Sequence, residues 1–291
     1  MPIKIYINGK FYDKKDAKVS VFDHGLLYGD GVFEGIRSYD RLIFRLKKHI
    51  DRLYRSARYI MLQIPLTKEE MIKAVCRTIA RNSLDNAYIR LIVTRGVGDL
   101  GLDPRKCKGG PSVIIIADKI KLYPEKYYKN GLAIITARTR QNSVYALNPA
   151  IKSLNYLTNI LAKIEAAGSS HEEAIMLNAK GHVTECTGDN IFIIKKNIVY
   201  TPPLSAGLLE GITRDAVIEI AKKKKIKLKQ ENFKLSKVYN ADECFLTGTA
   251  AELIPVIRVD KKKIGNGRPG GLTSMFREEF HKKTKADGVR Y

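Results

Sequence analysis

The chain has 291 residues, of which 44 % are hydrophobic and 28 % charged, as is typical of a water-soluble globular protein with one or two domains. Its formal net charge of +22 would suit a nucleic-acid-binding protein, but no nucleic-acid-binding motif accompanies the lysines, so we expect small anionic ligands and no nucleic acid. No apolar run reaches the roughly 18 residues of a membrane span, so we expect no membrane partner. The four cysteines are scattered and the five histidines form no cluster, so we expect neither a disulfide framework nor a metal site. This pattern indicates a reduced, cytoplasmic protein.

Hydrophobic periodicity predicts helices and strands in no regular alternation. In chain order we expect strands at 3–7 and 19–22, helices at 46–60 and 68–82, strands at 88–94, 112–117 and 132–136, a helix at 155–167, strands at 174–177, 191–194 and 198–200, a helix at 213–224, a strand at 243–246 and a helix at 273–283. Residues 119–130 are polar, aromatic and interrupted by a proline, which is typical of a linker. The pattern predicts an α+β (mixed α/β) protein with an N-terminal domain at 1–118, the linker at 119–130 and a C-terminal domain at 131–291.

One glycine-rich motif matches a dinucleotide-binding loop without its structural context. Gly96-Val-Gly98-Asp-Leu-Gly101 follows a predicted strand. Such a loop binds pyrophosphate only when its last glycine opens a helix, and here Pro104 and Pro111 leave no room for one. We interpret the motif as a plain loop with no nicotinamide or flavin role.

Lys152 directly precedes a predicted helix that Ser153 or Asn155 can cap. The positive end of a helix dipole and the apolar neighbours Ile151 and Leu154 both favour a neutral amine, which a lysine needs to react with an aldehyde cofactor. Taken alone, this window favours an ordinary surface lysine. The rest of the chain favours the catalytic interpretation.

Three further features suit such a cofactor. Glu185 ends a short strand, where its carboxylate can keep a pyridine nitrogen protonated. Backbone amides at 211–213 and 248–251, with nearby threonine hydroxyls, can bind phosphate. Arg52 shares a predicted helix face with His49 and Ser56 and can bind phosphate through two hydrogen bonds. Each feature alone is common in proteins of any function.

Seven motifs, in order along nearly the whole chain, resemble those of the branched-chain aminotransferases, which are fold-type IV pyridoxal-phosphate enzymes. They are Tyr28-Gly-Asp-Gly-Val-Phe33-Glu-Gly35-Ile-Arg37, His49-x-x-Arg52-Leu53, Tyr88-Ile-Arg90, Lys152-Ser-Leu-Asn-Tyr156-Leu157, Glu185-x-x-Gly-Asp-Asn190, Gly211-Ile-Thr213-Arg-Asp215 and Gly248-Thr249-Ala250-Ala-Glu252. The resemblance implies two domains, a pyridoxal 5'-phosphate cofactor, and a homodimer or higher homo-oligomer in which a partner subunit closes each active site.

The resemblance also implies a role for individual residues. Lys152 corresponds to the lysine that binds the cofactor aldehyde, Tyr156 to the partner of its phenolic oxygen, and Glu185 to the partner of its pyridine nitrogen. The remaining cofactor contacts are implied for Arg52, Leu209, Ile212, Thr213 and Thr249. The substrate side-chain pocket and carboxylate site are implied for Tyr28, Phe33, Gly35, Tyr88, Arg90, Thr249 and Ala250. The sequence departs from many relatives at Cys186, where they have glycine, which puts the packing of the cofactor in doubt at that point.

The implied activity is a transaminase that moves the amino group of L-leucine, L-isoleucine and L-valine to 2-oxoglutarate in a ping-pong cycle, the last step of branched-chain amino acid synthesis or the first of degradation. An apolar pocket around Phe33, Tyr28 and Tyr88 would suit these side chains. Two alternatives share the scaffold, a D-amino-acid aminotransferase and an aminodeoxychorismate lyase, although Tyr88-Ile-Arg90 favours the branched-chain type. The expected partners are amino acids and 2-oxo acids.

Overall fold

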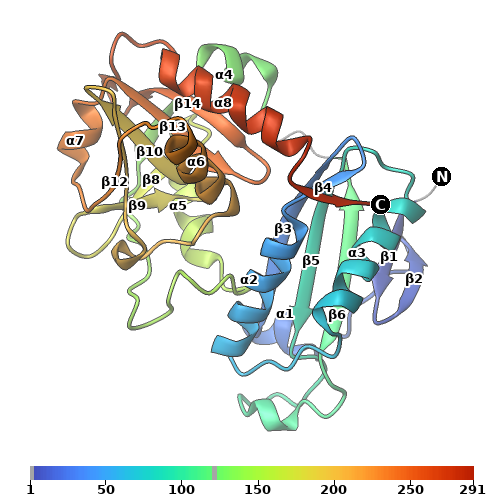
Figure 1. The fold of residues 1–291 in the computed structure, drawn as a ribbon. Coiled ribbons are helices and arrows are strands. Elements are labelled where there is room, and N and C mark those ends of the chain that lie inside the picture. The colour runs from blue at the N-terminus through green and yellow to red at the C-terminus, as the bar shows by residue number, and fades with distance from the viewer. Residues whose placement is uncertain (1–2, 120–122) are drawn as a thin grey trace. The chain divides into compact units, whose positions relative to one another are not determined.

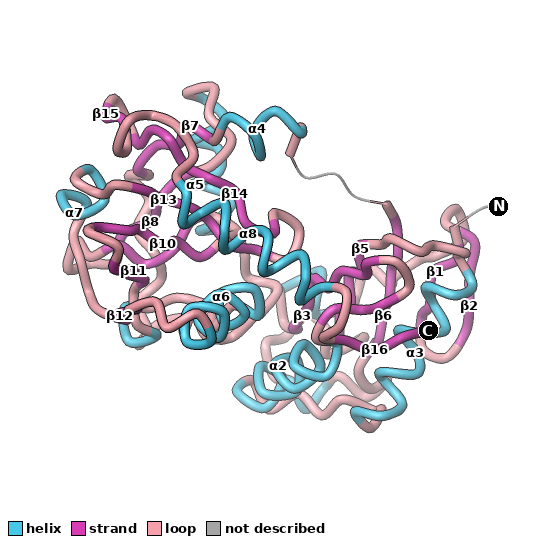
Figure 2. The backbone as a smooth tube through the Cα atoms, turned by 45° about the horizontal axis from the view of Figure 1, so that its top comes forward, coloured by secondary structure: helices cyan, strands magenta, loops and turns pink. Residues whose placement is uncertain are grey.

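The computed structural model describes residues 3–119 and 123–291, which divide into two compact units. The first unit comprises Met1–Ile120, Ile151–Asn155 and Thr284–Tyr291, and the second comprises Lys121–Ala150 and Tyr156–Lys283. Each unit combines helices and strands (Figure 1, and Figure 2 with helices in cyan and strands in magenta). The predicted mixed α and β class is therefore confirmed.

The first unit is built on a seven-stranded antiparallel sheet with the strand order β16-β4-β3-β5-β6-β1-β2. Two helices, α2 and α3, pack against this sheet and against each other (Figure 1). Its elements are β1 (Lys4–Ile7), β2 (Lys10–Asp13), α1 (His24–Tyr28), β3 (Gly31–Tyr39), β4 (Leu42–Phe44), α2 (Leu46–Tyr59), α3 (Lys68–Arg81), β5 (Tyr88–Thr94), the 3-10 helix η1 (Pro104–Lys106), β6 (Ser112–Asp118) and β16 (Gly288–Arg290).

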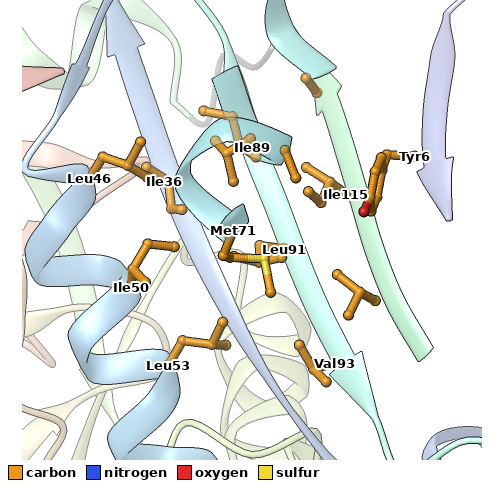
Figure 3. Packing of buried hydrophobic residues seen from close by; sticks show 14 of the residues in the cluster. Tyr6, Ile36, Leu46, Ile50, Leu53, Met71, Ile89, Leu91, Val93 and Ile115 are labelled. Carbon is orange, nitrogen blue, oxygen red and sulfur yellow. The ribbon is translucent and has the colours of Figure 1, made fainter. Parts of the chain in front are cut away.

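Local sequence explains why these elements form. Thr67 and Glu70 make a capping box at the start of α3, and the buried residues of that helix recur at helical spacing from Met71 onward. Figure 3 shows Leu53 of α2 and Met71 of α3 facing Leu91 of β5 in one continuous core. That core fixes α2 against β3, the strand that carries much of the candidate site described below.

The second unit is a nine-stranded mixed sheet in the order β12-β11-β10-β13-β14-β7-β8-β9, with β15 paired to β14. Three of its strand pairs are parallel, namely β11–β12, β14–β7 and β7–β8. Its elements are α4 (Glu125–Asn130), β7 (Leu132–Thr136), α5 (Leu157–Gly168), β8 (Ala174–Leu177), β9 (Val183–Cys186), β10 (Asn190–Lys195), β11 (Ile198–Thr201), the 3-10 helix η2 (Leu204–Ala206), α6 (Ile212–Lys223), β12 (Leu228–Gln230), α7 (Leu235–Tyr239), β13 (Glu243–Gly248), β14 (Glu252–Val259), β15 (Lys262–Lys263) and α8 (Gly271–Thr284).

The structure differs from the predicted elements at several points, since β2, β4, β14 and some shorter elements were also not predicted, and three of the differences have a plain physical reason. Residues 19–22 form no strand, because their backbone pairs with no strand and one of their carbonyls, that of Phe22, accepts from the Gly98 amide of a loop. The helix expected from residue 155 begins at Leu157. The periodicity analysis did not predict β3, since Gly31, Glu34 and Gly35 interrupt its apolar pattern although all three are buried.

The structure also bears on the glycine-rich motif, on the predicted linker and on the expected absence of membrane spans. Residues 96–111 form a loop with the short helix η1, as we interpreted them, and not a dinucleotide-binding turn. Of the predicted linker, residues 120–122 lie outside the described residues, and Glu125–Asn130 forms α4. Across residues 3–119 and 123–291, no helix has both the length and the apolar character needed to cross a membrane.

Candidate active site

Lys152 lies in an extended segment that pairs with the start of β3. The Phe33 amide donates to the Lys152 carbonyl at 3.0 Å, and the Leu154 amide donates to the Gly31 carbonyl at 2.9 Å. Between these bonds, Ser153 forms an antiparallel bridge with Val32. This pairing is why Ile151–Asn155 belongs to the first unit, whereas the sequence-based boundary assigns Lys152 to the C-terminal domain.

The expected position of Lys152 at a helix start is wrong. Helix α5 begins five residues later, and no side chain in the described residues caps it. The side chains expected to cap it act elsewhere, because Ser153 Oγ accepts from the Asn155 amide and Asn155 Nδ2 donates to the Gly29 carbonyl. Backbone pairing with β3, and not a helix dipole, therefore determines where Lys152 lies.

The Lys152 side chain extends over the aromatic ring of Phe33. Its Nζ lies 4.5 Å from the ring centroid, and the guanidinium carbon of Arg90 lies 4.7 Å from the same centroid. Both distances are within the range of cation–π attraction. The Lys152 amide also donates to Ser56 Oγ on α2 at 3.1 Å. Phe33 thus groups the lysine amine and an arginine that the sequence assigns to substrate binding.

Tyr88 and Gly35 complete this part of the site. Gly35 is directly opposite Arg90 in the β3–β5 pair, and Arg90 Nη2 lies 3.2 Å from Tyr88 Oη. A Cβ atom at Gly35 would lie 2.2 Å from Tyr88 Oη, so only glycine leaves this hydroxyl its place. Tyr28, also expected for this site from the resemblance, donates its hydroxyl to the Leu100 carbonyl.

Arg52 forms a buried ion pair that the sequence did not predict. Its Nε donates to Glu34 Oε1 at 2.7 Å and its Nη2 to Glu34 Oε2 at 2.8 Å, while His49 Nδ1 lies 2.7 Å from Glu34 Oε2. Glu34 is completely buried, and Arg52 is 3 % exposed. Burial alone would raise the pKa of Glu34, but Arg52 and His49 outweigh it and lower that pKa to about 2. Burial lowers the pKa of His49 despite the attraction of Glu34.

In the second unit, the Glu185 carboxylate at the end of β9 is held by three N–H donors. Gln141 Nε2 donates at 2.8 Å, Asn190 Nδ2 at 3.2 Å and the Leu209 amide at 3.1 Å. Glu185 is only 7 % exposed, so the prediction that it faces inward is confirmed. Gln141 was missed because it lies in a loop, where no periodicity distinguishes a ligand from a surface residue.

The predicted phosphate-binding segments lie close in the chain to these donors. Helix α6 starts at Ile212 with Gly211 as its cap residue, and Thr213 in its first turn is buried. Asn190, which donates to Glu185, also donates to the Leu209 carbonyl at 3.0 Å, and a Cβ at Gly211 would lie 1.9 Å from Asn190 Oδ1. Asn190 therefore joins the acid of the second unit to the start of α6.

The remaining predicted residues of the second unit lie at two turns. Thr249 and Ala250 are half-buried in the turn that joins β13 to β14. A Cβ at Gly248, just before them, would lie 1.8 Å from Asp189 Oδ1, so the turn passes close to the segment that follows Glu185. Tyr156 is half-buried and directly precedes α5.

These residues fit the groups that pyridoxal phosphate presents, which are an aldehyde, a pyridine nitrogen and a phosphate. Lys152 offers an amine, and hydrogen bonds hold its backbone at both the amide and the carbonyl. Glu185 accepts from N–H groups in the three hydrogen bonds given above, and a carboxylate acceptor is what a protonated pyridine nitrogen requires. No side chain among the described residues caps α6, and its cap residue is glycine, which leaves the first-turn amides to an anion.

Comparison with known proteins indicates an enzymatic class. Residues 31–259 match the family model for amino-transferase class IV. A putative branched-chain-amino-acid aminotransferase of Methanocaldococcus jannaschii is 55 % identical over 278 residues, which cover 96 % of this chain and 95 % of that protein. The branched-chain-amino-acid aminotransferase of Pseudomonas aeruginosa is 38 % identical over 282 residues, which cover 95 % and 91 %.

Solved structures give the same result. The branched-chain amino acid aminotransferase of Escherichia coli superposes with a TM-score of 0.93 at 33 % identity, covering 97 % of this chain and 94 % of that one. The branched-chain amino acid aminotransferase of Thermobaculum terrenum, solved in its pyridoxal-phosphate holo-form, superposes with a TM-score of 0.88 at 28 % identity, covering 97 % and 94 %.

Proposed function

Because the chain belongs to the class IV aminotransferases, and within them to the branched-chain-amino-acid aminotransferases, we propose that it transfers the amino group of L-leucine, L-isoleucine and L-valine to 2-oxoglutarate with pyridoxal phosphate as its cofactor. One observation carries the proposal: the Lys152 amine and the Arg90 guanidinium lie over a single aromatic ring, that of Phe33. An amine that can move a proton and a cation that can bind a carboxylate thereby contact the same ring.

We assign the cofactor contacts as follows. Lys152 would hold the aldehyde, and its amine would move the proton at the substrate Cα. Glu185 accepts from the pyridine nitrogen, and Tyr156 bonds the phenolic oxygen. The bound cofactor supplies an electron sink for the carbon that loses its proton. The phosphate and the ring face are assigned to Arg52, Leu209, Ile212, Thr213 and Thr249.

The substrate side chain is assigned to the ring of Phe33, with Tyr88 and Gly35 beside it and with Tyr28 and Ala250 as further contacts. Each methylene buried there is worth roughly 0.8 kcal/mol, which favours leucine, isoleucine and valine. The same pocket must accept the γ-carboxylate of glutamate. The Tyr88 hydroxyl and the Arg90 guanidinium, which are hydrogen-bonded to each other, supply the polar edge that this carboxylate needs.

We further infer a homodimer. The hydrogen bond from Tyr28 to Leu100 and the Asp23–Val97 bridge join residues 22–28 to residues 97–100. These two segments carry the exposed apolar side chains of Phe22, Leu26 and Leu100. In the second unit, α5 carries exposed Leu157, Ile160, Leu161 and Ile164 at helical spacing. Exposed apolar surfaces of this kind are typical of protein interfaces.

Sedimentation tests the homodimer. Substituting Leu26→Lys together with Leu100→Lys should produce monomers, whereas Met61→Lys, at an 82 % exposed residue outside these segments, should leave the assembly unchanged. A wild-type chain that sediments as a monomer would refute this assignment.

We also propose a reducing, cytoplasmic setting. All four cysteines are free thiols, and burial raises the pKa of Cys186 and of Cys244. Buried neutral thiols of this kind are inert and need no oxidising compartment. Fractionation of the source cells would test the location.

Stopped-flow half-reactions test the substrate directly. The visible absorption of the bound cofactor should disappear rapidly with L-isoleucine, L-leucine, L-valine or L-glutamate, and slowly with L-aspartate. Faster loss with D-alanine than with L-isoleucine would assign the protein to the D-amino-acid enzymes. Release of pyruvate from aminodeoxychorismate would assign it to the lyases.

A further inference from the structure

Helix α2 presents three buried polar residues to β3 and to the Lys152 segment. His49, Arg52 and Ser56 recur at helical spacing and are at most 3 % exposed. The first two bind the Glu34 carboxylate, and the third accepts from the Lys152 amide. One helix face therefore carries the arginine assigned to the cofactor phosphate and contacts the backbone of the cofactor lysine.

Glu34 is a charged residue between two apolar core residues on one side of β3. Its neighbours Val32 and Ile36, on the same side of β3, belong to the apolar core, and a well-packed apolar residue in place of a buried ion pair is often as stable or more so. A carboxylate with two charge-assisted bonds to one guanidinium instead fixes the plane and direction of that guanidinium. Since an ionised carboxylate only accepts, His49 Nδ1 must carry the hydrogen in its bond to Glu34.

We propose that Glu34 is a positioning residue, which orients the Arg52 guanidinium for the cofactor phosphate, with His49 holding Glu34 in turn. This inference rests on the proposed function, in which Arg52 binds that phosphate. The two bonds to Glu34 use Nε and Nη2 of Arg52, so they fix the plane of the guanidinium and with it the direction of the Nη1 hydrogens.

Titration of the full-length chain, stripped of cofactor, with pyridoxal phosphate and with pyridoxal tests the proposal. Glu34→Asp keeps the charge but shortens the side chain, and Glu34→Gln removes the charge. Both variants should raise the Kd for pyridoxal phosphate about tenfold and leave the Kd for pyridoxal unchanged, because only the phosphate contact is affected. His49→Asn should raise the same Kd by a smaller factor.

Two further variants separate positioning from charge and from general damage. In an Arg52→Gln background, Glu34→Gln should cause no further change in the Kd for pyridoxal phosphate, since Glu34 acts through Arg52. Asp287→Asn removes the carboxylate partner of another buried arginine of the first unit, Arg45, and should leave both Kd values unchanged.

Several outcomes would overturn the inference. If Glu34→Asp binds pyridoxal phosphate as tightly as the wild type, or if Glu34→Gln binds it more tightly, Glu34 acts by charge or not at all. An equal loss for pyridoxal would indicate a general structural role. A wild-type chain that binds no pyridoxal phosphate at Lys152 would instead refute the proposed function itself.

Discussion

Two buried carboxylates, one in each unit, are held in contrasting ways. Glu34 of the first unit is bonded by the Arg52 guanidinium and by His49. Glu185 of the second unit accepts from two side-chain amides and one backbone amide, all of them neutral donors. Both carboxylates are more than nine-tenths buried, so the difference lies in their donors and not in their exposure.

This contrast separates two uses of a buried acid. A cation beside a carboxylate neutralises it, so Glu34 serves Arg52 and has little charge left to offer a ligand. Neutral amides stabilise a carboxylate through hydrogen bonds while leaving its charge in place. The three donors of Glu185 named above are amides that add no charge of their own, and we therefore propose Glu185 as the acid for a cationic ligand group such as a protonated pyridine nitrogen.

Removing the cofactor lysine would test the premise of this contrast and should have the largest effect. Lys152→Ala should abolish the visible absorption of the bound cofactor and lower kcat by roughly 10²–10⁴-fold or more, because we assign the movement of the Cα proton to the Lys152 amine. Lys163→Ala, at a lysine bonded to the Glu172 carbonyl, is the control and should behave as wild type. Peptide mapping after borohydride reduction that placed the cofactor on another lysine would contradict the assignment.

Glu185→Gln tests the role of the neutral donor set. We expect kcat to fall roughly a hundredfold while cofactor binding stays largely intact, because we propose that the acid tunes the cofactor ring and that the phosphate contacts supply most of the affinity. Glu173→Gln removes the charge of another buried carboxylate of the second unit, which accepts from the Ala174 and Thr187 amides, and should leave kcat unchanged. Single-turnover kinetics with L-isoleucine measure both.

Arg52→Ala should show the opposite pattern to Glu185→Gln. Loss of a charge-assisted phosphate contact should weaken pyridoxal phosphate binding by about 1.5–3 kcal/mol, with a smaller effect on the chemistry once the cofactor is saturating. Arg58→Ala, at an exposed arginine of the same helix, should not affect binding. Equal loss of cofactor in the Arg52 and Glu185 variants would break the distinction between them.

Gly35→Ala tests whether the two faces of β3 act independently, one on substrate binding and the other, through Glu34, on cofactor binding. The new methyl group would meet Tyr88 Oη at 2.2 Å, so the hydroxyl must move, and KM for L-leucine and L-glutamate should rise roughly tenfold. The Kd for pyridoxal phosphate should not change, because Glu34 points the other way. Gly168→Ala meets nothing within 4 Å and is the control.

The smallest effect concerns acid stability. The pKa of Glu34 falls from 4.5 to about 2 on folding, so its contribution to the free energy of unfolding is complete above pH 4.5 and is lost as the pH falls toward 2. His49, whose pKa is also lowered, acts in the same direction below pH 6.5. Urea unfolding at several pH values should show the difference between wild type and Glu34→Gln shrinking over that range. A constant difference would contradict the ion-pair assignment.

The sequence by itself predicted the elements whose signals are local. The buried positions of α2 and α3 recur at helical spacing, and β5 alternates, so periodicity located all three. The ordered motifs identified Lys152, Glu185 and Arg52 as candidates. Strand β3 escaped because glycines and a glutamate interrupt its pattern, although the fold buries them.

Only the tertiary structure decided which side chains meet. Glu34 and Arg52 are 18 residues apart, Gln141 and Glu185 are 44 apart, and the Lys152 amide and Ser56 are 96 apart. Periodicity reports the burial of a residue relative to its neighbours along the chain, whereas these partners are brought together by strand pairing and helix packing between distant segments. For the same reason the sequence predicted a helix that begins just after Lys152, whereas pairing with β3 keeps the chain extended there and α5 begins only at Leu157.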